Sequence, residues 1–100
     1  MMKLTYEISK LALEDLENIW AHTVEQWSKE QANKYYNKII SAINLICENP
    51  DSGKPIDEIK KGFRITYVKS HMIIYKVKGT TIYIARILNQ KMDIEKHLDE

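Results

Sequence analysis

Three side chains in the second half of the sequence are of the types that perform acid–base chemistry. Arg64, His71 and Tyr75 fall on or beside neighbouring predicted strands. A histidine, a tyrosine and an arginine placed together can activate the 2′-hydroxyl of RNA for cleavage. The spacing alone does not require an active site, and in a simpler interpretation His71 caps a turn while Tyr75 packs in the core. We favour the simpler interpretation and keep ribonuclease catalysis by these three residues as the alternative.

The sequence has no motif for a disulfide, a metal site, a phosphate-binding loop or a nucleophilic serine. The single cysteine, Cys47, cannot form an internal disulfide, and His22, His71 and His97 lack the close spacing of a metal site. The three glycines do not form a phosphate-binding loop, and no serine lies in a nucleophile elbow. We therefore expect no metal and no cofactor.

Two arginines and two tryptophans are candidates for contacts with a partner protein. Arg64 and Arg86 each stand alone among apolar residues of a predicted strand. Such an arginine usually packs its stem on the sheet and keeps its head in water, but it can also anchor a carboxylate or phosphate of a partner. Trp20 and Trp27 share one face of a predicted helix, where they either fill the core or, if exposed, anchor a partner.

Length and charge limit the class of protein. A chain of 100 residues with 44% hydrophobic and 29% charged residues is expected to form one domain over 1–100. The net charge of +1, from 15 basic and 14 acidic side chains, argues against direct, specific binding of nucleic acid. The apolar runs are too short to cross a bilayer, and the N-terminus has no signal-peptide pattern. With its lone cysteine, the chain is expected in the cytoplasm, without a membrane partner.

Helices dominate the predicted N-terminal half. Alternation over residues 2–8 predicts a short strand with one buried face. Helical periodicity then predicts a first helix that Ser9 caps and that ends near Trp27, with Asp15 early in it, where the helix dipole favours acids. A second helix of about 21 residues, roughly 30 Å long, begins at Ser28, in a capping box with Gln31, and continues until Pro50. The very short connection predicts an antiparallel helical hairpin.

The C-terminal half is predicted to be mainly strands. Residues 50–62 read as an irregular connection, and 63–68, 72–78 and 81–88 as three strands joined by short turns, which makes them a meander. Residues 91–98 are expected to contain a short helix. The fold class is therefore α+β, with the helical hairpin packed on a mostly antiparallel four-stranded sheet. The sequence does not place the first strand in the strand order.

Several motifs resemble the ParE branch of the RelE/ParE toxin superfamily. The motif Gly62-Phe63-Arg64 opens one strand, and the turn Ser70-His71 leads to Ile73-Ile74-Tyr75 in the next. The segment Ala85-Arg86-Ile87-Leu88-Asn89-Gln90 leads through Met92-Asp93 to His97-Leu98. Each motif is weak alone, but the combination is specific and covers nearly the whole chain. The N-terminal half adds matches at Ala12, Glu14, Asp15, Leu16, Ile19, Trp20, Trp27, Gln31, Ala32, Tyr35 and Glu48-Asn49-Pro50.

One position departs from the family pattern. Asn89 stands where the family usually has histidine. An asparagine side chain forms hydrogen bonds but cannot transfer a proton near neutral pH. Any chemistry that the histidine performs in a relative is therefore not expected here.

The resemblance implies a toxin of a type II toxin-antitoxin, or plasmid stabilisation, system. Members of this branch resemble RelE ribonucleases in fold but lack their catalytic set, and they typically poison DNA gyrase. A ParD-like antitoxin neutralises them by laying its C-terminal segment along the toxin. On this reading, the predicted partner-binding residues are Arg64, Arg86, Trp20, Trp27, Tyr35, Asn89 and Met92. The alternative is a RelE-like, ribosome-dependent mRNA endonuclease that uses His71, Tyr75 and Arg64.

Overall fold

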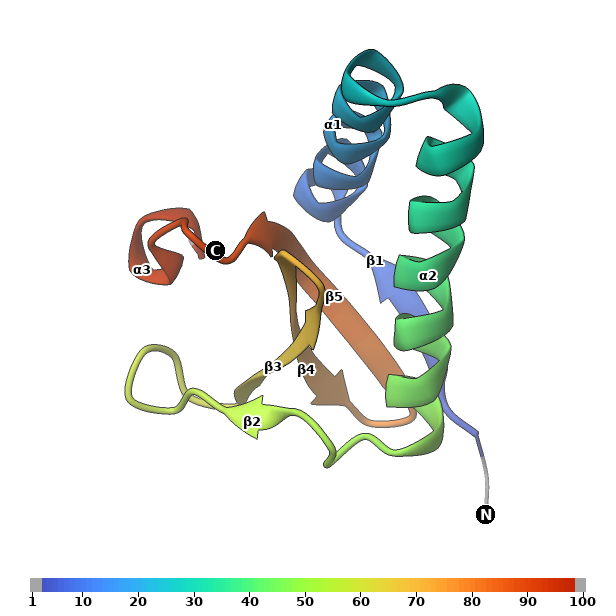
Figure 1. Cartoon of the computed structure of the whole chain (residues 1–100). Coiled ribbons are helices and arrows are strands. Elements are labelled where there is room, and N and C mark those ends of the chain that lie inside the picture. Colours follow the sequence, from blue (N-terminus) through green and yellow to red (C-terminus); the bar gives the residue numbers. More distant parts are fainter. Residues whose placement is uncertain (1–2, 99–100) are drawn as a thin grey trace.

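A computed structural model describes residues 3–98 as a mixed sheet with a pair of long helices on one side (Figure 1). A short strand begins the chain and two helices follow it. Four strands and a short C-terminal helix complete the order. The elements are β1 (Thr5–Ile8), α1 (Lys10–Gln26), α2 (Lys29–Glu48), β2 (Lys54–Pro55), β3 (Phe63–Val68), β4 (His71–Lys78), β5 (Thr81–Asn89) and α3 (Ile94–His97).

Serine caps set the beginning of both long helices. The Ser9 side chain accepts a hydrogen bond from the Ala12 amide at 3.0 Å, and the Ser28 side chain accepts one from the Gln31 amide at 3.1 Å. These bonds satisfy backbone donors that a helix leaves free in its first turn. The predicted capping box is half formed, because the Gln31 side chain makes no return bond to Ser28 among the described residues.

The strands form one sheet in the order β1-β5-β4-β3-β2. β3, β4 and β5 are the predicted antiparallel meander, and β1 pairs with β5 in parallel, which the sequence left open. The prediction of four strands was one short: within the segment taken as irregular, Lys54 and Pro55 pair with Ile65 and Arg64. A strand of two residues leaves no periodic pattern in a sequence, because its pairing is entirely tertiary.

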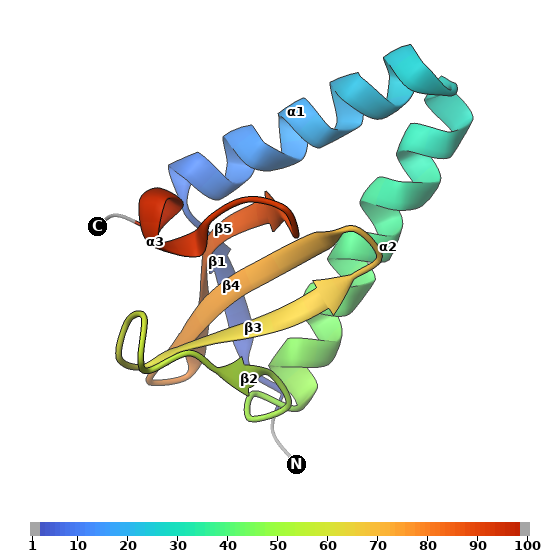
Figure 2. The same ribbon diagram turned by 60° about the vertical axis from the view of Figure 1, so that its left-hand side comes forward.

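Each face of the sheet carries its own apolar cluster. On the hairpin side, buried residues of both long helices pack on β4 and β5, with Leu16, Ile39, Ile73 and Tyr75 at 2% exposure or less. On the other side, Ile56 and Leu98 cover Phe63, Met72 and Leu88. Figure 2 shows the hairpin along one face of the sheet and α3 close to β5. The α+β class with a helical hairpin on the sheet is therefore confirmed.

The ends of the predicted apolar stripes are more exposed than the pattern suggested. Tyr6, expected on the buried face of the first strand, is 38% exposed, because β1 is an edge strand. Trp27 lies one residue beyond α1 and is 78% exposed. None of the helices in residues 3–98 is long and apolar enough to cross a membrane.

Candidate partner-binding site

The structure brings three of the predicted partner-binding residues to one place. Trp27, Tyr35 and Asn89 line a groove of about 750 Å³ where the far end of the helical hairpin faces the turn between β3 and β4. We call this the hairpin-tip groove. It is lined by Asn18, Ile19, His22, Thr23, Trp27, Gln31, Tyr35, Lys69, Ser70, His71 and Asn89.

A tyrosine–histidine pair lines this groove. The Tyr35 hydroxyl donates to the Val68 carbonyl at 3.0 Å and lies 2.7 Å from His71 Nδ1. The Ser70 hydroxyl lies 3.3 Å from the same nitrogen, and the tautomer of His71 decides which of these groups donates. Burial lowers the pKa of His71 below its ordinary value of 6.5. The neutral ring has one nitrogen that donates and one that accepts.

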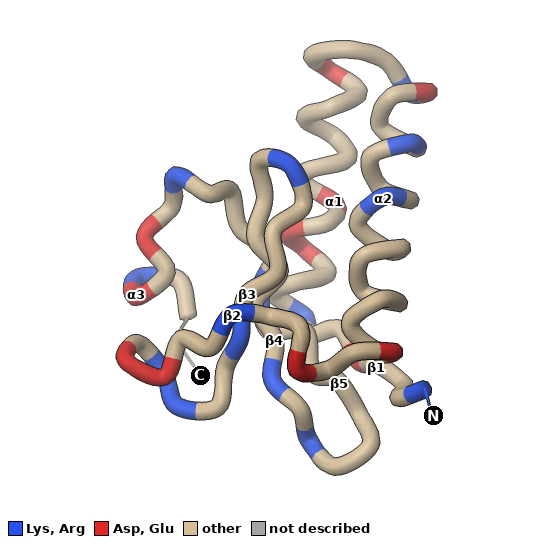
Figure 3. The backbone as a smooth tube through the Cα atoms, turned by 60° about the horizontal axis from the view of Figure 1, so that its bottom comes forward, with Lys and Arg blue, Asp and Glu red and all other residues tan. Residues whose placement is uncertain are grey.

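The turn between β3 and β4 forms one rim of the hairpin-tip groove. Lys69 adopts φ 52°, the only positive φ of a non-glycine residue in 3–98. This left-handed conformation costs a β-carbon-bearing residue roughly 1 kcal/mol or more. Figure 3 shows the turn as a basic segment facing the helices. Glycine would be less strained than lysine at this position.

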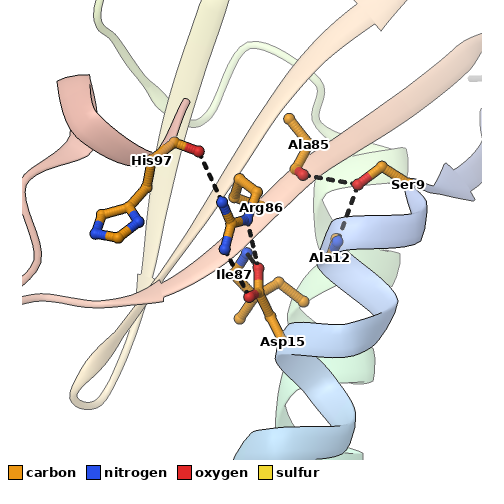
Figure 4. Close-up of polar contacts among 7 residues, drawn as sticks. All are labelled: Ser9, Ala12, Asp15, Ala85, Arg86, Ile87 and His97. Atoms are coloured by element: carbon orange, nitrogen blue, oxygen red, sulfur yellow. Dashed lines mark hydrogen bonds and ion pairs between the residues drawn. The ribbon is translucent and has the colours of Figure 1, made fainter. Parts of the chain in front are cut away.

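Arg86 lies elsewhere and has its partners inside the chain (Figure 4). Its Nε and Nη2 donate to the two carboxylate oxygens of Asp15 at 2.8 and 2.9 Å, and its Nη1 donates to the His97 carbonyl at 2.7 Å. The pair is largely buried, with side-chain exposures of 17% for Arg86 and 13% for Asp15. The hydrogen bonds that Arg86 donates to Asp15 raise the pKa of Arg86. The partner carboxylate that we predicted for Arg86 is thus supplied by α1 itself.

Ser9 and Asp15 also form hydrogen bonds with backbone groups of β5 just beyond the end of β1. The pairing of β1 with β5 ends at Ile84, and the register of β5 against β4 shifts between Ile84 and Arg86. The Ser9 hydroxyl donates to the Ala85 carbonyl at 2.7 Å, and Asp15 accepts from the Ile87 amide at 2.9 Å. Unpaired backbone groups at a sheet edge need such partners. The Asp15–Arg86 pair therefore links α1, β5 and the C-terminal segment.

The remaining predicted residues are distributed over the surface. Arg64 donates to the carbonyls of Gly53 at 2.7 Å and Asp51 at 3.1 Å, so part of its guanidinium fixes the segment after α2. Trp20 is half-buried and donates to Asn33 of α2 at 3.0 Å, outside the hairpin-tip groove. Met92, between β5 and α3, is 46% exposed.

The three residues of the catalytic alternative are not assembled into one site. Tyr75 is completely buried, and its hydroxyl accepts from the Gly53 amide at 3.0 Å and donates to the Pro50 carbonyl at 2.8 Å. His71 begins β4, four residues before Tyr75, which separates them by about 13 Å along the strand. Tyr75 therefore has the core position of the simpler interpretation.

Sequence reasoning missed two contacts that organise these features. Asp15 was assigned to the helix dipole, whereas it pairs with an arginine 71 positions away. Gly53 was taken only as a loop residue, although a β-carbon there would overlap the Tyr75 hydroxyl and ring. Neither contact has a local sequence signal, because both join distant segments. In the part of the chain that the structure describes, no group of three histidine, cysteine or acidic residues could hold a metal ion.

Comparison with known proteins gives consistent matches over most of the chain. The model of the family described as "ParE toxin of type II toxin-antitoxin system, parDE" matches residues 6–94. Toxin ParE1 of Mycobacterium tuberculosis is 37% identical over 98 residues, covering 97% of this chain and 100% of the relative. Toxin ParE1 of Caulobacter vibrioides is 34% identical over 93 residues, covering 93% and 96%.

Solved structures share the fold. The chromosomal ParDE toxin-antitoxin system from P. aeruginosa contains a chain that matches with a TM-score of 0.76 at 22% identity, covering 87% of this chain and 96% of that one. A chain of the RelBE2 toxin-antitoxin complex from Mycobacterium tuberculosis matches with a TM-score of 0.68 at 16% identity, covering 88% and 99%.

Proposed function

Because this chain belongs to the ParE toxin family of type II toxin-antitoxin systems, we propose that it arrests bacterial growth by binding DNA gyrase and that a cognate, ParD-like antitoxin neutralises it. Gyrase is the target that the resemblance implies. An antitoxin partner is supported by the structural relatives, which belong to a ParDE toxin-antitoxin system and to the RelBE2 toxin-antitoxin complex.

The hairpin-tip groove is our candidate site for the antitoxin, and it is the main support for this part of the proposal. It combines the exposed Trp27 with Tyr35 and with the polar end of β5 at Asn89. A large aromatic side chain at the rim of a groove is a typical anchor for an amphipathic helix of a partner. Trp20 lines a separate hollow with Leu13 and Tyr36, and there it keeps its proposed role in the antitoxin contact.

The C-terminal segment from Met92 to Leu98 is our candidate for the target contact. Arg86 holds the segment through the His97 carbonyl, and Leu98 is buried on the sheet. Met92 stays 46% exposed, so an apolar side chain projects from a fixed backbone. We assign Arg86 a positioning role and Met92 a contact role. Arg64 keeps, on its partly exposed side, the proposed role of meeting a partner carboxylate.

The ribonuclease alternative has less support. It needs a base, an acid and a cation within reach of one 2′-hydroxyl, whereas the Tyr75 hydroxyl is buried and has two backbone partners. Asn89 replaces the histidine of the family at the end of β5 and cannot supply a proton.

Induced expression in a bacterial host, with and without the antitoxin gene, tests the proposal. Expression of the wild-type chain should stop growth, and co-expression of the antitoxin should restore it. Trp27→Ser should remain toxic but need more antitoxin for rescue. Leu45→Ser, which removes a 60% exposed apolar side chain of α2 outside the groove, is the matched control and should be rescued like wild type. A folded chain that leaves growth unchanged would contradict the function, and a defect only in Leu45→Ser would contradict the placement of the antitoxin.

A further inference from the structure

Positive charge is concentrated in the second half of the chain. Residues 59–92 contain no aspartate or glutamate, although the whole chain has 14 acidic residues. The lysines and arginines of the same segment are Lys60, Lys61, Arg64, Lys69, Lys76, Lys78, Arg86 and Lys91. Arg86 is paired with Asp15, and Arg64 lies 3.7 Å from Asp51, so lysines carry the rest of this charge.

Half of these basic residues gather at one end of the sheet. We call them the lysine patch, and its members are Lys60, Lys61, Lys76 and Lys78. The ammonium groups of Lys60 and Lys76 lie 5.8 and 5.0 Å from the centre of the Phe63 ring. That of Lys78 lies 4.7 Å from the centre of the Tyr83 ring. Both rings belong to the sheet face opposite the helical hairpin, and Figure 3 shows blue segments of the β2–β3 connection and of β4 at this end of the sheet.

The lysine patch is not neutralised by nearby carboxylates. The segments that cover this face of the sheet contain the acidic residues Asp57, Glu58, Asp93 and Glu95. Within residues 3–98, none of these forms an ion pair with Lys60, Lys61 or Lys78. Asp57 instead accepts a hydrogen bond from the Gly62 amide at 2.8 Å. An anionic ligand can therefore meet these three ammonium groups.

The chemistry of the lysine patch favours phosphates on a duplex over other anions. Phe63 is only 1% exposed, and an ammonium group lies over Tyr83. Single-stranded nucleic acid needs exposed rings for stacking, a protein partner needs an aromatic or apolar anchor, and a membrane surface needs apolar side chains that insert. Lysine is a mobile point charge that suits phosphate, whereas arginine is preferred for two-point contact with a carboxylate.

We propose that the lysine patch contacts the phosphates of duplex DNA without reading its sequence. The inference deepens the proposed function and rests on it for the source of the DNA, because gyrase, the proposed target, acts on duplex DNA. A weak contact is sufficient there, since binding to gyrase raises the effective concentration of DNA beside the patch. The net charge of +1 limits the affinity for free DNA, which agrees with a contact that positions rather than specifies.

The salt dependence of DNA binding tests the inference without gyrase. A fluorescein-labelled duplex of about 16 base pairs is titrated with the protein at about 25 to 150 mM NaCl, and binding is followed by anisotropy. Each neutralised phosphate contributes about 0.9 to the slope of log affinity against log salt. Three or four lysines therefore predict a slope of about −3. Two duplexes of unrelated sequence should bind equally.

Matched triple variants separate the patch from overall charge. Lys60→Gln, Lys61→Gln and Lys78→Gln are combined, and Lys76 is left unchanged because it has a further interaction. The slope should become about −1, and the affinity at the lowest salt should fall at least about tenfold. Arginine at the same three positions should preserve binding, because the charge remains. The control combines glutamine at three exposed positions of α2, and it should bind like wild type; these positions are Lys29, Lys34 and Lys38.

Four results would overturn the inference. These are no binding of the duplex at the lowest salt, equal losses in the patch and α2 variants, tighter binding of single-stranded DNA of the same length, and displacement of the duplex by vesicles that contain about 20% phosphatidylserine. Gyrase takes no part in this assay. A protein that binds duplex DNA through the patch but spares gyrase would leave this inference standing and refute the proposed target. Inhibition of gyrase by a protein that does not bind the duplex would do the reverse.

Discussion

Removal of the largely buried Asp15–Arg86 pair should cost much more stability than removal of the exposed Glu30–Lys34 pair. Arg86→Met deletes three N–H donors, two to Asp15 at 2.8 and 2.9 Å and one to the His97 carbonyl at 2.7 Å. It also leaves Asp15, with 13% of its side chain exposed, without a counter-charge. Loss of one partner from a fully buried pair costs 3–5 kcal/mol. Because this pair keeps some contact with water, we expect about 3 kcal/mol for Arg86→Met.

A double-mutant cycle isolates the pair from other effects of each change. Arg86→Met, Asp15→Asn and the double variant are unfolded in urea and followed by circular dichroism. The coupling free energy should be about 2 kcal/mol, within the range for residues in direct contact. The melting temperature of Arg86→Met should fall on the order of 15 °C for a domain of this size. A typical domain has a free energy of unfolding of about 5–15 kcal/mol, so the variants should still fold.

An exposed ion pair of the same chain provides the control for this cycle. Glu30 and Lys34 are 3.9 Å apart on α2, with side-chain exposures of 81% and 68%. Their coupling free energy should be about 0.5 kcal/mol or less, because water and salt screen exposed charges. Additive losses at Asp15 and Arg86, or a coupling no larger than that of the control pair, would refute the role we give to this contact.

Two further predictions follow from buried contacts. Gly53→Ala should lower the free energy of unfolding by about 1–3 kcal/mol, because the new β-carbon would overlap the buried Tyr75 hydroxyl and ring. Urea unfolding should show this loss, and a midpoint equal to that of the exposed control Ser52→Ala would contradict it. Burial holds the pKa of His71 below 6.5, so the unfolded chain binds more protons just below that pH. Stability should therefore fall as pH drops from 6.5 and level off below the native pKa, with a slope of at most about 1.4 kcal/mol per pH unit from this residue. His71→Gln should lose stability less steeply between pH 6.5 and 5.5, and parallel curves for the two chains would contradict the assigned pKa direction.

Periodicity predicted most of the secondary structure. The two serine caps, the apolar stripes of the hairpin and the three strands of the meander are local patterns, and they appear where expected: the predicted strand 63–68 is β3 without change. The parallel partner of β1 and the two-residue strand β2 depend on contacts between distant segments. A single sequence carries no local record of such contacts.

The candidate site was predicted only in part, for the same reason. Residue type singled out Trp27, and the family resemblance added Tyr35 and Asn89. Their convergence on one groove required α1, α2 and the ends of β3, β4 and β5 to be placed together. Arg86 was recognised as unusual, but its partner Asp15 on α1 lies 71 positions away, and no local sequence pattern indicates the pair. A lone arginine in a strand looks the same whether its carboxylate is within the chain or on another protein.

Supercoiling of relaxed plasmid by purified DNA gyrase, titrated with this protein beside a cell-free translation reaction, tests the central claim most directly. We predict loss of supercoiling or trapped cleaved DNA, with translation intact, and recovery of gyrase activity when the antitoxin is added. Blocked translation with gyrase untouched would contradict it and favour the RelE-like ribonuclease.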